Sequence, residues 1–568
     1  MDKHASNIVE QSPAHGAVYT RPWVVELILD LAGYTPDRNL VDALAVEPAV
    51  GEGAFFTQMA ARLVASCQRQ GRPLQDCLPA LLAYESDPRS AAIAVSKTAD
   101  TLIRLGVPKD LSQSLAHQWI TVGNYLLESE KWLLANNGRD NQALLPPSEL
   151  QADFVIGNPP YIRLEDIPTR ENTLYRSMYR TMKGRADIYI AFYEAALCQL
   201  KPGGVLGFIC ADRWMFNQYG SALRNLITSN FNVKAIIEMH HAEAFESQVD
   251  AYPAITVISR QPQAQVILGN IKVNGQSIEP TALTGLLHSI ETDDIDSVGM
   301  EGITARRTPP WFSADEPWLN ISVERRLLLR RLEQDYPPLQ DPITETRVGI
   351  GLATGADSVF ITRDQEIVER ERLLPLALTN DIRTGDLRWS NHYLINPWQN
   401  ERLVDLTQYP RLKAYLDEHK PKLQKRNVAQ RNPEVWFRTI DRVEEGLSAR
   451  PKLYIPDIKS TIFPVLDTGV TYPHHNLYFI TSGIWNLEIL GAILMSDVGK
   501  FFVECYGVRM RGGYLRMQAQ YLRRIHVPAP GRISEQLGEG LSRAFRERDV
   551  RAATALVLRL YEIDYIPS

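Results

Sequence analysis

The chain has 568 residues, 45% of them hydrophobic and 23% charged, a composition typical of globular enzymes rather than disordered or fibrous chains. It shows neither a long uncharged apolar stretch nor an apolar N-terminal segment, so we expect a cytoplasmic protein without a membrane span or secretory signal. The five scattered cysteines form no CxxC pair and have no histidine partner at metal spacing, so they are interpreted as reduced core or surface residues. The net charge of −6 by itself argues against a nucleic-acid partner.

The first elements are expected to be a helix, a strand, a glycine-containing turn and a second helix. Thr20 is placed as the N-cap of the first helix, and the strand that follows ends at Glu47. Gly51 and Gly53 allow a ligand to approach the backbone at the start of the second helix, which runs to about Arg69. A carboxylate at this strand end repels phosphates and attracts an amine. The pattern therefore favours S-adenosylmethionine over a dinucleotide.

Two further strand ends carry polar residues. Glu85 ends the second strand, where an acid can bind the hydroxyls of a ribose, although acids at strand ends are also common surface residues. Asn124 and Tyr125 follow a third short strand, and both side chains can contact an adenine ring.

The stretch 153–161, with the sequence DFVIGNPPY, ends a buried strand in a rigid turn. Pro159 and Pro160 fix φ and remove two backbone donors, so the strand cannot continue. The turn presents two fixed acceptors, the amide oxygen of Asn158 and the carbonyl of Pro159, beside the ring of Tyr161. This set fits a planar group with an amino donor, such as adenine or cytosine, although the tetrapeptide alone could be an ordinary strand end.

Helices and strands alternate to about residue 260, which predicts an α/β domain, 1–262, with a parallel Rossmann-like sheet covered by helices on both faces. Within this domain the segment 164–185 is expected to be polar and mobile. Residues 263–320 change to short strands and loops and are interpreted as a linker or extension. Residues 321–568 are expected to form a second, α+β domain, with a glycine-rich segment at 348–360.

Basic side chains are concentrated in the second part of the chain. Residues 1–300 carry a net charge of −9 and residues 301–568 a net charge of +3. Residues 411–431 hold seven basic side chains against two acidic ones, and residues 505–534 hold six arginines and no acid. Such local stripes mark a surface for a phosphate backbone, although a single stripe is more often only a solvated face. The candidate DNA-contacting arginines are Arg509, Arg511 and Arg516.

Taken in order, these residues resemble the γ-class (TaqI-type) adenine-N6 DNA methyltransferases of restriction-modification and related defence systems. The ordered set is more specific than any single motif and covers most of the chain. It comprises Thr20, Glu47-Pro48-Ala49-Val50-Gly51-Glu52-Gly53, Glu85, Asn124-Tyr125-Leu126, Asn158-Pro159-Pro160-Tyr161 and Phe245. The resemblance implies that 321–568 is a target-recognition domain, with Gly513 and Tyr514 among its DNA contacts.

The resemblance also implies a role for each site residue. The methionine part of S-adenosylmethionine would be bound by Thr20, Glu47, Ala49, Gly51 and Gly53, and the ribose hydroxyls by Glu85. Asn124 and Tyr125 would contact the cofactor adenine. Because the family usually has Asp at the Asn124 position, weaker but retained binding is expected.

For the reaction, the resemblance implies a target adenine that is flipped out of double-stranded DNA, with Tyr161 stacked on one side and Phe245 on the other. Asn158 and Pro159 would accept hydrogen bonds from its amino group, and neither a general base nor a metal is required. Such an enzyme is expected to act as a monomer on DNA and to protect host DNA from a separately encoded endonuclease.

Three alternatives share parts of this pattern. Methyltransferases of glutamine side chains or RNA bases share the Asn-Pro-Pro-Tyr turn but generally lack a large C-terminal domain. Cytosine-N4 enzymes more often have Ser in place of Asn. A catalytically idle DNA-binding or sensor protein would not be expected to retain Glu47, Gly51, Gly53 and the motif 158–161.

Nuclease and metal chemistry are not expected. Residues 457–459 form only a fragment of the PD…(D/E)xK pattern. The pairs His240-His241 and His474-His475 have no metal partners at useful spacing and are interpreted as structural or surface residues.

Overall fold

The protein is described from a computed structural model, which divides the chain into two compact units, Met1–Leu319 and Asn320–Ser568. The structure describes residues 18–133, 151–240, 242–247, 252–272, 285, 297–300, 302–310, 312, 316–319, 321–507 and 514–567.

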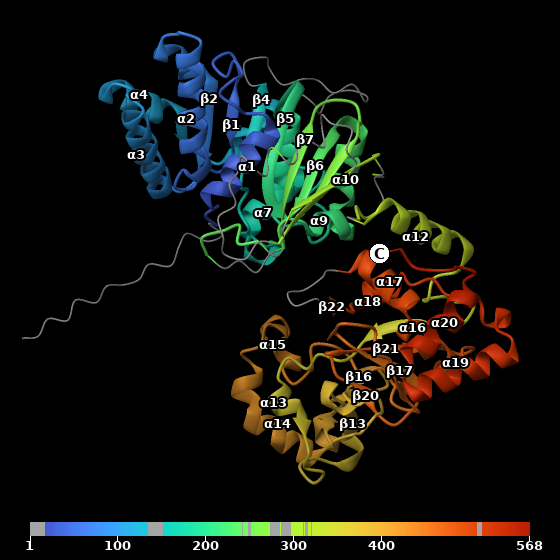
Figure 1. Ribbon diagram of the computed structural model, residues 1–568. Coiled ribbons are helices and arrows are strands. Elements are labelled where there is room, and N and C mark those ends of the chain that lie inside the picture. Colours follow the sequence, from blue (N-terminus) through green and yellow to red (C-terminus); the bar gives the residue numbers. More distant parts are fainter. Residues whose placement is uncertain are drawn as a thin grey trace, which may run out of the picture. The chain divides into compact units, whose positions relative to one another are not determined.

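The first unit is built on a ten-stranded sheet with the order β3-β2-β1-β4-β5-β7-β6-β8-β10-β9 (Figure 1). Neighbouring strands from β3 to β5 pair in parallel, while β7 pairs antiparallel with both β5 and β6. The strands are β1 (Ala45–Glu47), β2 (Leu81–Glu85), β3 (Ile120–Val122), β4 (Ala152–Gly157), β5 (Leu200–Ala211), β6 (Asn232–Glu238), β7 (Pro253–Ser259), β8 (Val266–Ile271), β9 (Ser297–Met300) and β10 (Ile303–Thr308). Strand order reverses between β1 and β4, which is where open α/β sheets bind their ligands.

Helices cover both faces of this sheet, so the predicted α/β class is confirmed. Successive side chains of a strand point to opposite faces. Accordingly Ala45 packs in a core with α1 and α2, whereas its neighbour Val46 packs in a second core with α8. The helices are α1 (Pro22–Ala32), α2 (Ala54–Arg69), α3 (Pro88–Arg104), α4 (Lys109–Trp119), α5 (Tyr125–Glu128), α6 (Glu130–Leu133), α7 (Thr169–Met178), α8 (Tyr189–Gln199), α9 (Arg213–Phe216) and α10 (Ser221–Asn230), with short 3-10 helices at η1 (Leu74–Ala80), η4 (Leu164–Asp166) and η5 (Gln218–Gly220).

One local expectation for this unit was wrong, and a second segment is more ordered in secondary structure than its sequence suggested. The N-cap of α1 is Arg21, without a side-chain capping bond, and the hydroxyl of Thr20 instead accepts a hydrogen bond from Asn158 Nδ2. The segment 164–185, expected to be polar and mobile, contains helix α7, because Tyr175 anchors it in the core. The buried side chains of Ile167, Tyr175, Tyr179 and Met182 are spaced too irregularly to show as a periodic pattern in so polar a stretch.

Residues 263–320, interpreted from the sequence as a linker or extension, supply strands β8, β9 and β10 to the sheet of the first unit. Strand β8 pairs in parallel with β6, and β10 pairs antiparallel with β8. The buried side chains of Val266, Leu268 and Ile303 explain why the segment joins the sheet.

The second unit combines small sheets with helices, as the sequence predicted. Its two four-stranded sheets have the orders β11-β21-β17-β19 and β12-β14-β13-β20. The strands are β11 (Arg347–Ile350), β12 (Ile361–Thr362), β13 (Leu373–Ala377), β14 (Tyr393–Ile395), β15 (Trp398–Gln399), β16 (Arg402–Leu403), β17 (Lys452–Pro456), β18 (Ile458–Lys459), β19 (Val465–Asp467), β20 (Tyr472–Pro473), β21 (Leu477–Thr481) and β22 (Leu515–Arg516).

The helices of the second unit include long ones at its end, α19 and α20, which pack on α16. They are α12 (Val323–Asp335), α13 (Asp357–Phe360), α14 (Pro410–Leu423), α15 (Asn427–Arg431), α16 (Leu487–Met495), α17 (Asp497–Tyr506), α18 (Ala519–Leu522), α19 (Glu535–Glu547) and α20 (Val550–Leu560), with 3-10 helices at η6 (Arg370–Arg372), η7 (Thr379–Ile382), η8 (Leu406–Gln408), η9 (Pro433–Val435) and η10 (Pro530–Arg532). Among the residues described for the whole chain, none of the helices combines the length and the apolar character that a membrane span requires.

Candidate active site

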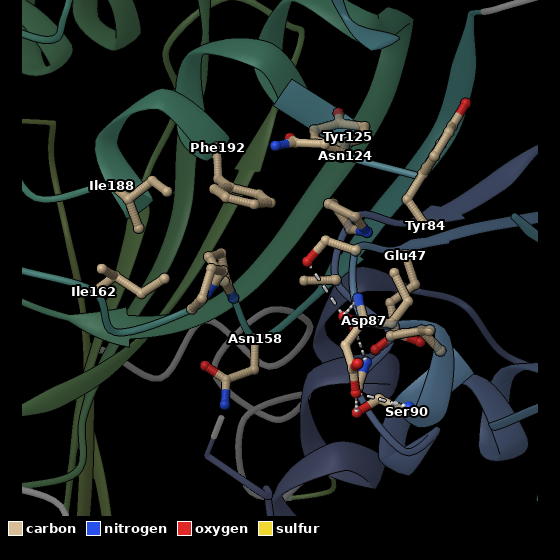
Figure 2. Close-up of a pocket in the computed structure, with 18 of the residues that line it drawn as sticks. Glu47, Tyr84, Asp87, Ser90, Asn124, Tyr125, Asn158, Ile162, Ile188 and Phe192 are labelled. Atoms are coloured by element: carbon tan, nitrogen blue, oxygen red, sulfur yellow. Dashed lines mark hydrogen bonds between the residues drawn. The ribbon is translucent and has the colours of Figure 1, made fainter. Parts of the chain in front are cut away.

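A cavity opens in the first unit at the carboxyl ends of four parallel strands. Glu47 and Glu85 are the last residues of β1 and β2, Asn158 directly follows β4, and Asn124 lies just beyond β3. Since the carboxyl ends of parallel strands lie at one edge of a sheet, four polar residues that are distant in sequence converge there. In Figure 2, Glu47, Asp87 and Ser90 lie on one side of this cavity, and Ile162, Ile188 and Phe192 lie on the other.

The structure brings most of the sequence-predicted site residues together. Those that line the cavity are Thr20, Glu47, Ala49, Gly51, Glu85, Asn124, Tyr125, Asn158, Pro159, Pro160 and Tyr161. Gly53 is not part of the lining: it caps helix α2 with a φ of 92°, a conformation that favours glycine. Phe245 lies behind the lining, where its ring contacts Tyr161 and its backbone forms a β-bridge with Thr20.

Sequence reasoning missed several residues of the lining. The N-terminal segment contributes Val18 and Tyr19, and the hydroxyl of Tyr19 donates to Glu52 Oε1 at 2.9 Å. Burial, followed by this contact with Glu52, raises the pKa of Tyr19 to about 12. The other missed residues include Tyr84, Ser86, Asp87, Ser90, Ile162, Glu171, Tyr175, Ile188 and Phe192. The apolar residues among them belong to no recognisable motif. Their segments reach the cavity only in the folded chain.

Glu47 is the most unusual ionisable group of the cavity. Its side chain is buried, and among the described residues Oε2 has no hydrogen-bond partner. Burial, with a smaller contribution from the charge of Glu85, raises the pKa of the Glu47 carboxyl well above its usual range. An unpaired buried carboxylate is costly, so this position favours a cationic or hydrogen-bond-donating ligand group.

Glu85, in contrast, is held in place by the backbone. Its Oε2 accepts from the amide of Gly51 at 2.8 Å, and its Oε1 accepts from the amide of Asp87 at 2.8 Å. These bonds link the glycine turn after β1 to the end of β2 and orient the carboxylate. A carboxylate oxygen can accept more than one hydrogen bond, so Glu85 retains acceptor capacity for hydroxyl groups of a ligand.

The side-chain amide of Asn158 has a defined orientation. Its Nδ2 donates to the carbonyl of Val18 at 3.0 Å and to Thr20 Oγ1 at 3.2 Å. Both donors of the amide are thereby used, and its acceptor, Oδ1, is buried without a hydrogen-bond partner among the described residues. The protein therefore fixes an unpaired acceptor at the end of β4, beside the cavity (Figure 2).

Tyr161 and Phe245 contact each other directly. Their ring centroids are 5.8 Å apart and their planes are inclined by 78°. Two rings that enclose a planar base between them must be parallel and further apart, so in this conformation one of the rings has to swing away before a base can enter. The Tyr161 hydroxyl is buried without a partner among the described residues, and burial raises its pKa.

Asn124 makes two hydrogen bonds that determine how it can contact a ligand. Its Oδ1 caps helix α5 by accepting from the amide of Leu126 at 3.0 Å, and its Nδ2 donates to the hydroxyl of Tyr175 at 2.8 Å. An aspartate at this position could not donate a hydrogen bond to Tyr175, because both oxygens of a carboxylate are acceptors. The neighbouring Tyr125 is almost fully buried and its ring stacks on Phe192, so it supports the cavity wall.

The candidate DNA-contacting residues are described only in part. Arg509, Arg511 and Gly513 lie outside the described residues. Tyr514 is half-exposed, and Arg516 forms an ion pair with Asp457 at 3.0 Å. Asp457 belongs to the fragment 457–459 considered for nuclease chemistry, and its contact with Arg516 gives it a different role.

The two histidine pairs were expected to have no metal-binding partners, and the fold changes this for one of them. His240 Nε2 lies 2.6 Å from Asp212 Oδ2, while His241 lies outside the described residues. His474 and His475 lie close to Asp357, which is distant in sequence. The spacing of these residues in the sequence could not reveal the contact. It arises in the folded chain, where Leu352, near Asp357 in the sequence, pairs with His474.

A family model matches part of the chain, and curated relatives match nearly all of it. The family described as Eco57I restriction-modification methylase matches residues 89–245. Among curated proteins, the Type II methyltransferase M.PaeR7I of Pseudomonas aeruginosa is 42% identical over 97% of this chain and 92% of its own length. The Type II methyltransferase M.XhoI of Xanthomonas vasicola is 40% identical over 97% of both chains.

Among solved structures, the Type IIL restriction-modification enzyme MmeI in complex with DNA has a TM-score of 0.59 and 11% identity, covering 95% of this chain and 72% of that one. The Type ISP restriction-modification enzyme LlaGI, solved with a DNA substrate mimic, has a TM-score of 0.53 and 14% identity over 94% of this chain and 46% of that one. At such identities the two structures show a shared fold.

Proposed function

The chain belongs to the Type II methyltransferases of restriction-modification systems, and on this premise we propose that it transfers a methyl group from S-adenosylmethionine to N6 of adenine in double-stranded DNA. The single observation that carries transfer to an exocyclic amine is the buried, unpaired acceptor Asn158 Oδ1 beside the cavity, and its being an asparagine rather than a serine favours adenine over cytosine. We further propose that the first unit is catalytic, that the second recognises the DNA target, and that methylation protects host DNA from a cognate endonuclease.

The cavity fits the proposed methyl donor. S-adenosylmethionine supplies an electrophilic methyl group on a sulfonium, and its amino acid part carries an ammonium. The unpaired Oε2 of Glu47 would accept from that ammonium, and the backbone-held Glu85 would accept from the ribose hydroxyls. The apolar side formed by Ile162, Ile188 and Phe192 suits the faces of an adenine ring.

Asn158 and Pro159 would act on the target amino group. The lone pair of an exocyclic amine is delocalised into the ring, which makes the amine a weak nucleophile. Two acceptors that bind its hydrogens favour the pyramidal nitrogen of the transition state over the planar ground state. Because Val18 and Thr20 hold the Asn158 amide in place, Oδ1 needs no reorganisation at the moment of transfer. The proton leaves after the nitrogen has become cationic, so a strong base is not needed.

The experiment that tests this function is transfer of tritiated methyl groups to unmodified double-stranded DNA, followed by digestion and separation of the nucleosides. Label in N6-methyladenine is the expected result. Label in N4-methylcytosine would overturn the adenine assignment, and label in RNA or protein with none in DNA would overturn the substrate class. Modification-sensitive sequencing of DNA from expressing cells would then give the recognition sequence.

Replacing Asn124 with aspartate is expected to tighten the binding of S-adenosylmethionine by about three- to tenfold, because a carboxylate forms stronger hydrogen bonds than an amide oxygen. Aspartate can still cap helix α5, and its second oxygen becomes an acceptor where Asn124 now donates to Tyr175. Calorimetric titration measures the change. The matched control is Asn172→Asp, which introduces the same charge on helix α7 outside the cavity lining. Equal effects of the two substitutions would contradict a specific role for position 124.

Replacing Arg516 with alanine is expected to weaken DNA binding. It should also reduce the slope of the logarithm of the binding constant against the logarithm of the salt concentration by about one. The ion pair with Asp457 orients the Arg516 side chain, which remains half-exposed. Fluorescence anisotropy over a range of salt concentrations gives the slope. Arg546→Ala is a suitable control, because Arg546 is also an exposed arginine paired with an acid, Glu488. An unchanged slope in Arg516→Ala would remove this residue from the interface.

A further inference from the structure

A second cluster of polar side chains lies in the unit Asn320–Ser568. Asp357, His474 and His475 each present one atom that can bind a metal, and these atoms lie within 4.8 Å of one another. His474 Nε2 is 3.2 Å from Asp357 Oδ2, and the two imidazole rings have centroids 4.1 Å apart. The first helical turn of α13 supplies the carboxylate, and the turn after β20 supplies both imidazoles.

The backbone that carries this cluster is firmly held. The amide of His474 donates to Ala377 O and the amide of His475 donates to Leu352 O, both at 3.1 Å. The glycine-rich segment runs against the same turn: a Cβ at Gly351 would lie 2.1 Å from the carbonyl oxygen of His474, so only glycine fits there. Both histidines are thus positioned by hydrogen bonds and close packing before any ligand binds.

Asp357 is oriented in the same way. The buried hydroxyl of Thr354 donates to Asp357 Oδ1 at 2.5 Å, which leaves Oδ2 directed at His474. A hydrogen bond from a second residue to a liganding carboxylate is the usual support of a metal site. The Asp357 side chain is 47% exposed, so an ion from solvent can reach it.

Hydrogen bonds within the cluster do not account for His475. Its Nδ1 is buried and has no hydrogen-bond partner among the described residues. An unsatisfied buried polar atom costs roughly 1–3 kcal/mol. An ion held by the three side chains would bind the lone pair of an imidazole nitrogen that otherwise has no partner, and this would offset the cost.

We propose that Asp357, His474 and His475 form a site for a divalent transition-metal ion of the Zn²⁺ type, with a fourth position for water. Two imidazoles and one carboxylate are a donor set that Zn²⁺ binds tightly. In a tetrahedral site with bonds of about 2.0–2.1 Å, ligand atoms are about 3.4 Å apart. The His474–Asp357 distance of 3.2 Å already fits. The three ligand atoms lie within 4.8 Å of one another, so small side-chain rotations bring them to this spacing.

The ion would fasten the glycine-rich segment to the turn after β20, two segments that are 117 residues apart at His474 and Asp357. The proposal differs from the sequence expectation that the chain has no metal site. It concerns only the second unit and is independent of the proposed methyl transfer.

The test is Zn²⁺ binding by the full-length, tag-free chain after removal of bound metal with a chelator. The protein is titrated with Zn²⁺ against a chromogenic chelator, and with Co²⁺, whose visible absorption reports tetrahedral coordination by nitrogen and oxygen. We expect one tight site per chain and a tetrahedral Co²⁺ spectrum. Lack of uptake by the native chain, or a Co²⁺ spectrum of octahedral type, would overturn the proposal.

Variants identify the ligands. His475→Ala and Asp357→Asn are each expected to lose at least about tenfold in Zn²⁺ affinity, and Thr354→Val should weaken binding less while keeping one ion per chain. His117→Ala, which removes an exposed histidine of helix α4, is the matched control and should bind Zn²⁺ as the native chain does. Thermal unfolding of each metal-free variant checks its fold. Equal Zn²⁺ affinity in His475→Ala, Asp357→Asn and the native chain would show binding elsewhere and overturn the proposal.

Discussion

The Asn158→Ala variant is expected to lose methyl transfer by a factor of at least about 10²–10³, the usual effect of removing one preorganised hydrogen-bonding group from a transition state. The loss should be in kcat, because in the proposed mechanism Oδ1 acts on the amine as it becomes pyramidal rather than on the bound ground state. Binding of S-adenosylmethionine and of DNA should change little. Single-turnover transfer with saturating DNA measures the chemical step directly.

The hydrogen bonds of Asn158 suggest a graded control. Thr20→Val removes one of the two groups that hold the amide but leaves Oδ1 in place. This variant should therefore lose far less activity than Asn158→Ala, since the carbonyl of Val18 still orients the amide. Full activity of Asn158→Ala would show that the acceptor at the end of β4 is not part of the chemistry. Equal losses in both variants would point to a local change of structure instead.

The main site residues were predictable because each is tied to the end of a strand. Glu47, Glu85 and Asn158 terminate hydrophobic strands, and the fold requires the carboxyl ends of parallel strands to meet at one edge. The order of strands in the sheet was not needed for this prediction. The class of fold followed similarly from the alternation of helices and strands, which is a property of local sequence.

Contacts between distant segments could not be predicted. The hydroxyl of Tyr175 binds the amide of Asn124 only because helix α7, in a stretch with little apolar periodicity, brings Tyr175 to the N-terminus of α5. The edge-to-face contact of Tyr161 and Phe245 depends on a loop that joins β6 to β7. The approach of Asp357 to His474 depends on the pairing of Leu352 with His474. In each case the determining interaction is tertiary and leaves no local pattern.

The affinity for S-adenosylmethionine is expected to rise with pH by up to about tenfold per pH unit, up to the pKa of the Glu47 carboxyl in the unliganded protein. Burial raises this pKa, which favours a bound proton at the position where the ammonium of the proposed methyl donor would bind. A cation favours the ionised carboxylate, and binding below that pKa therefore releases a proton. Calorimetry in two buffers with different ionisation enthalpies measures the number of protons released.

Glu47→Gln should remove both this proton release and the pH dependence, and should weaken binding by roughly 10- to 100-fold, as for loss of a hydrogen bond to a charged group. Glu52→Gln is the matched control, because Glu52 lies in the same glycine turn but is already paired with Lys97. The same pH dependence in the native chain and in Glu47→Gln would assign the proton to another group.

The same carboxyl has the opposite effect on the stability of the protein without ligand. A raised pKa means that the folded state binds the Glu47 proton more tightly than the unfolded state, so stability falls as pH rises from the unfolded pKa towards the folded one. Glu47→Gln cannot ionise, and at pH 8 its unliganded form is expected to unfold at a higher temperature than the native chain. Adding S-adenosylmethionine should reverse this order, because the cation then stabilises the native carboxylate. An unliganded Glu47→Gln protein that is less stable than the native chain at pH 8 would show that the buried carboxyl contributes to the fold rather than opposing it.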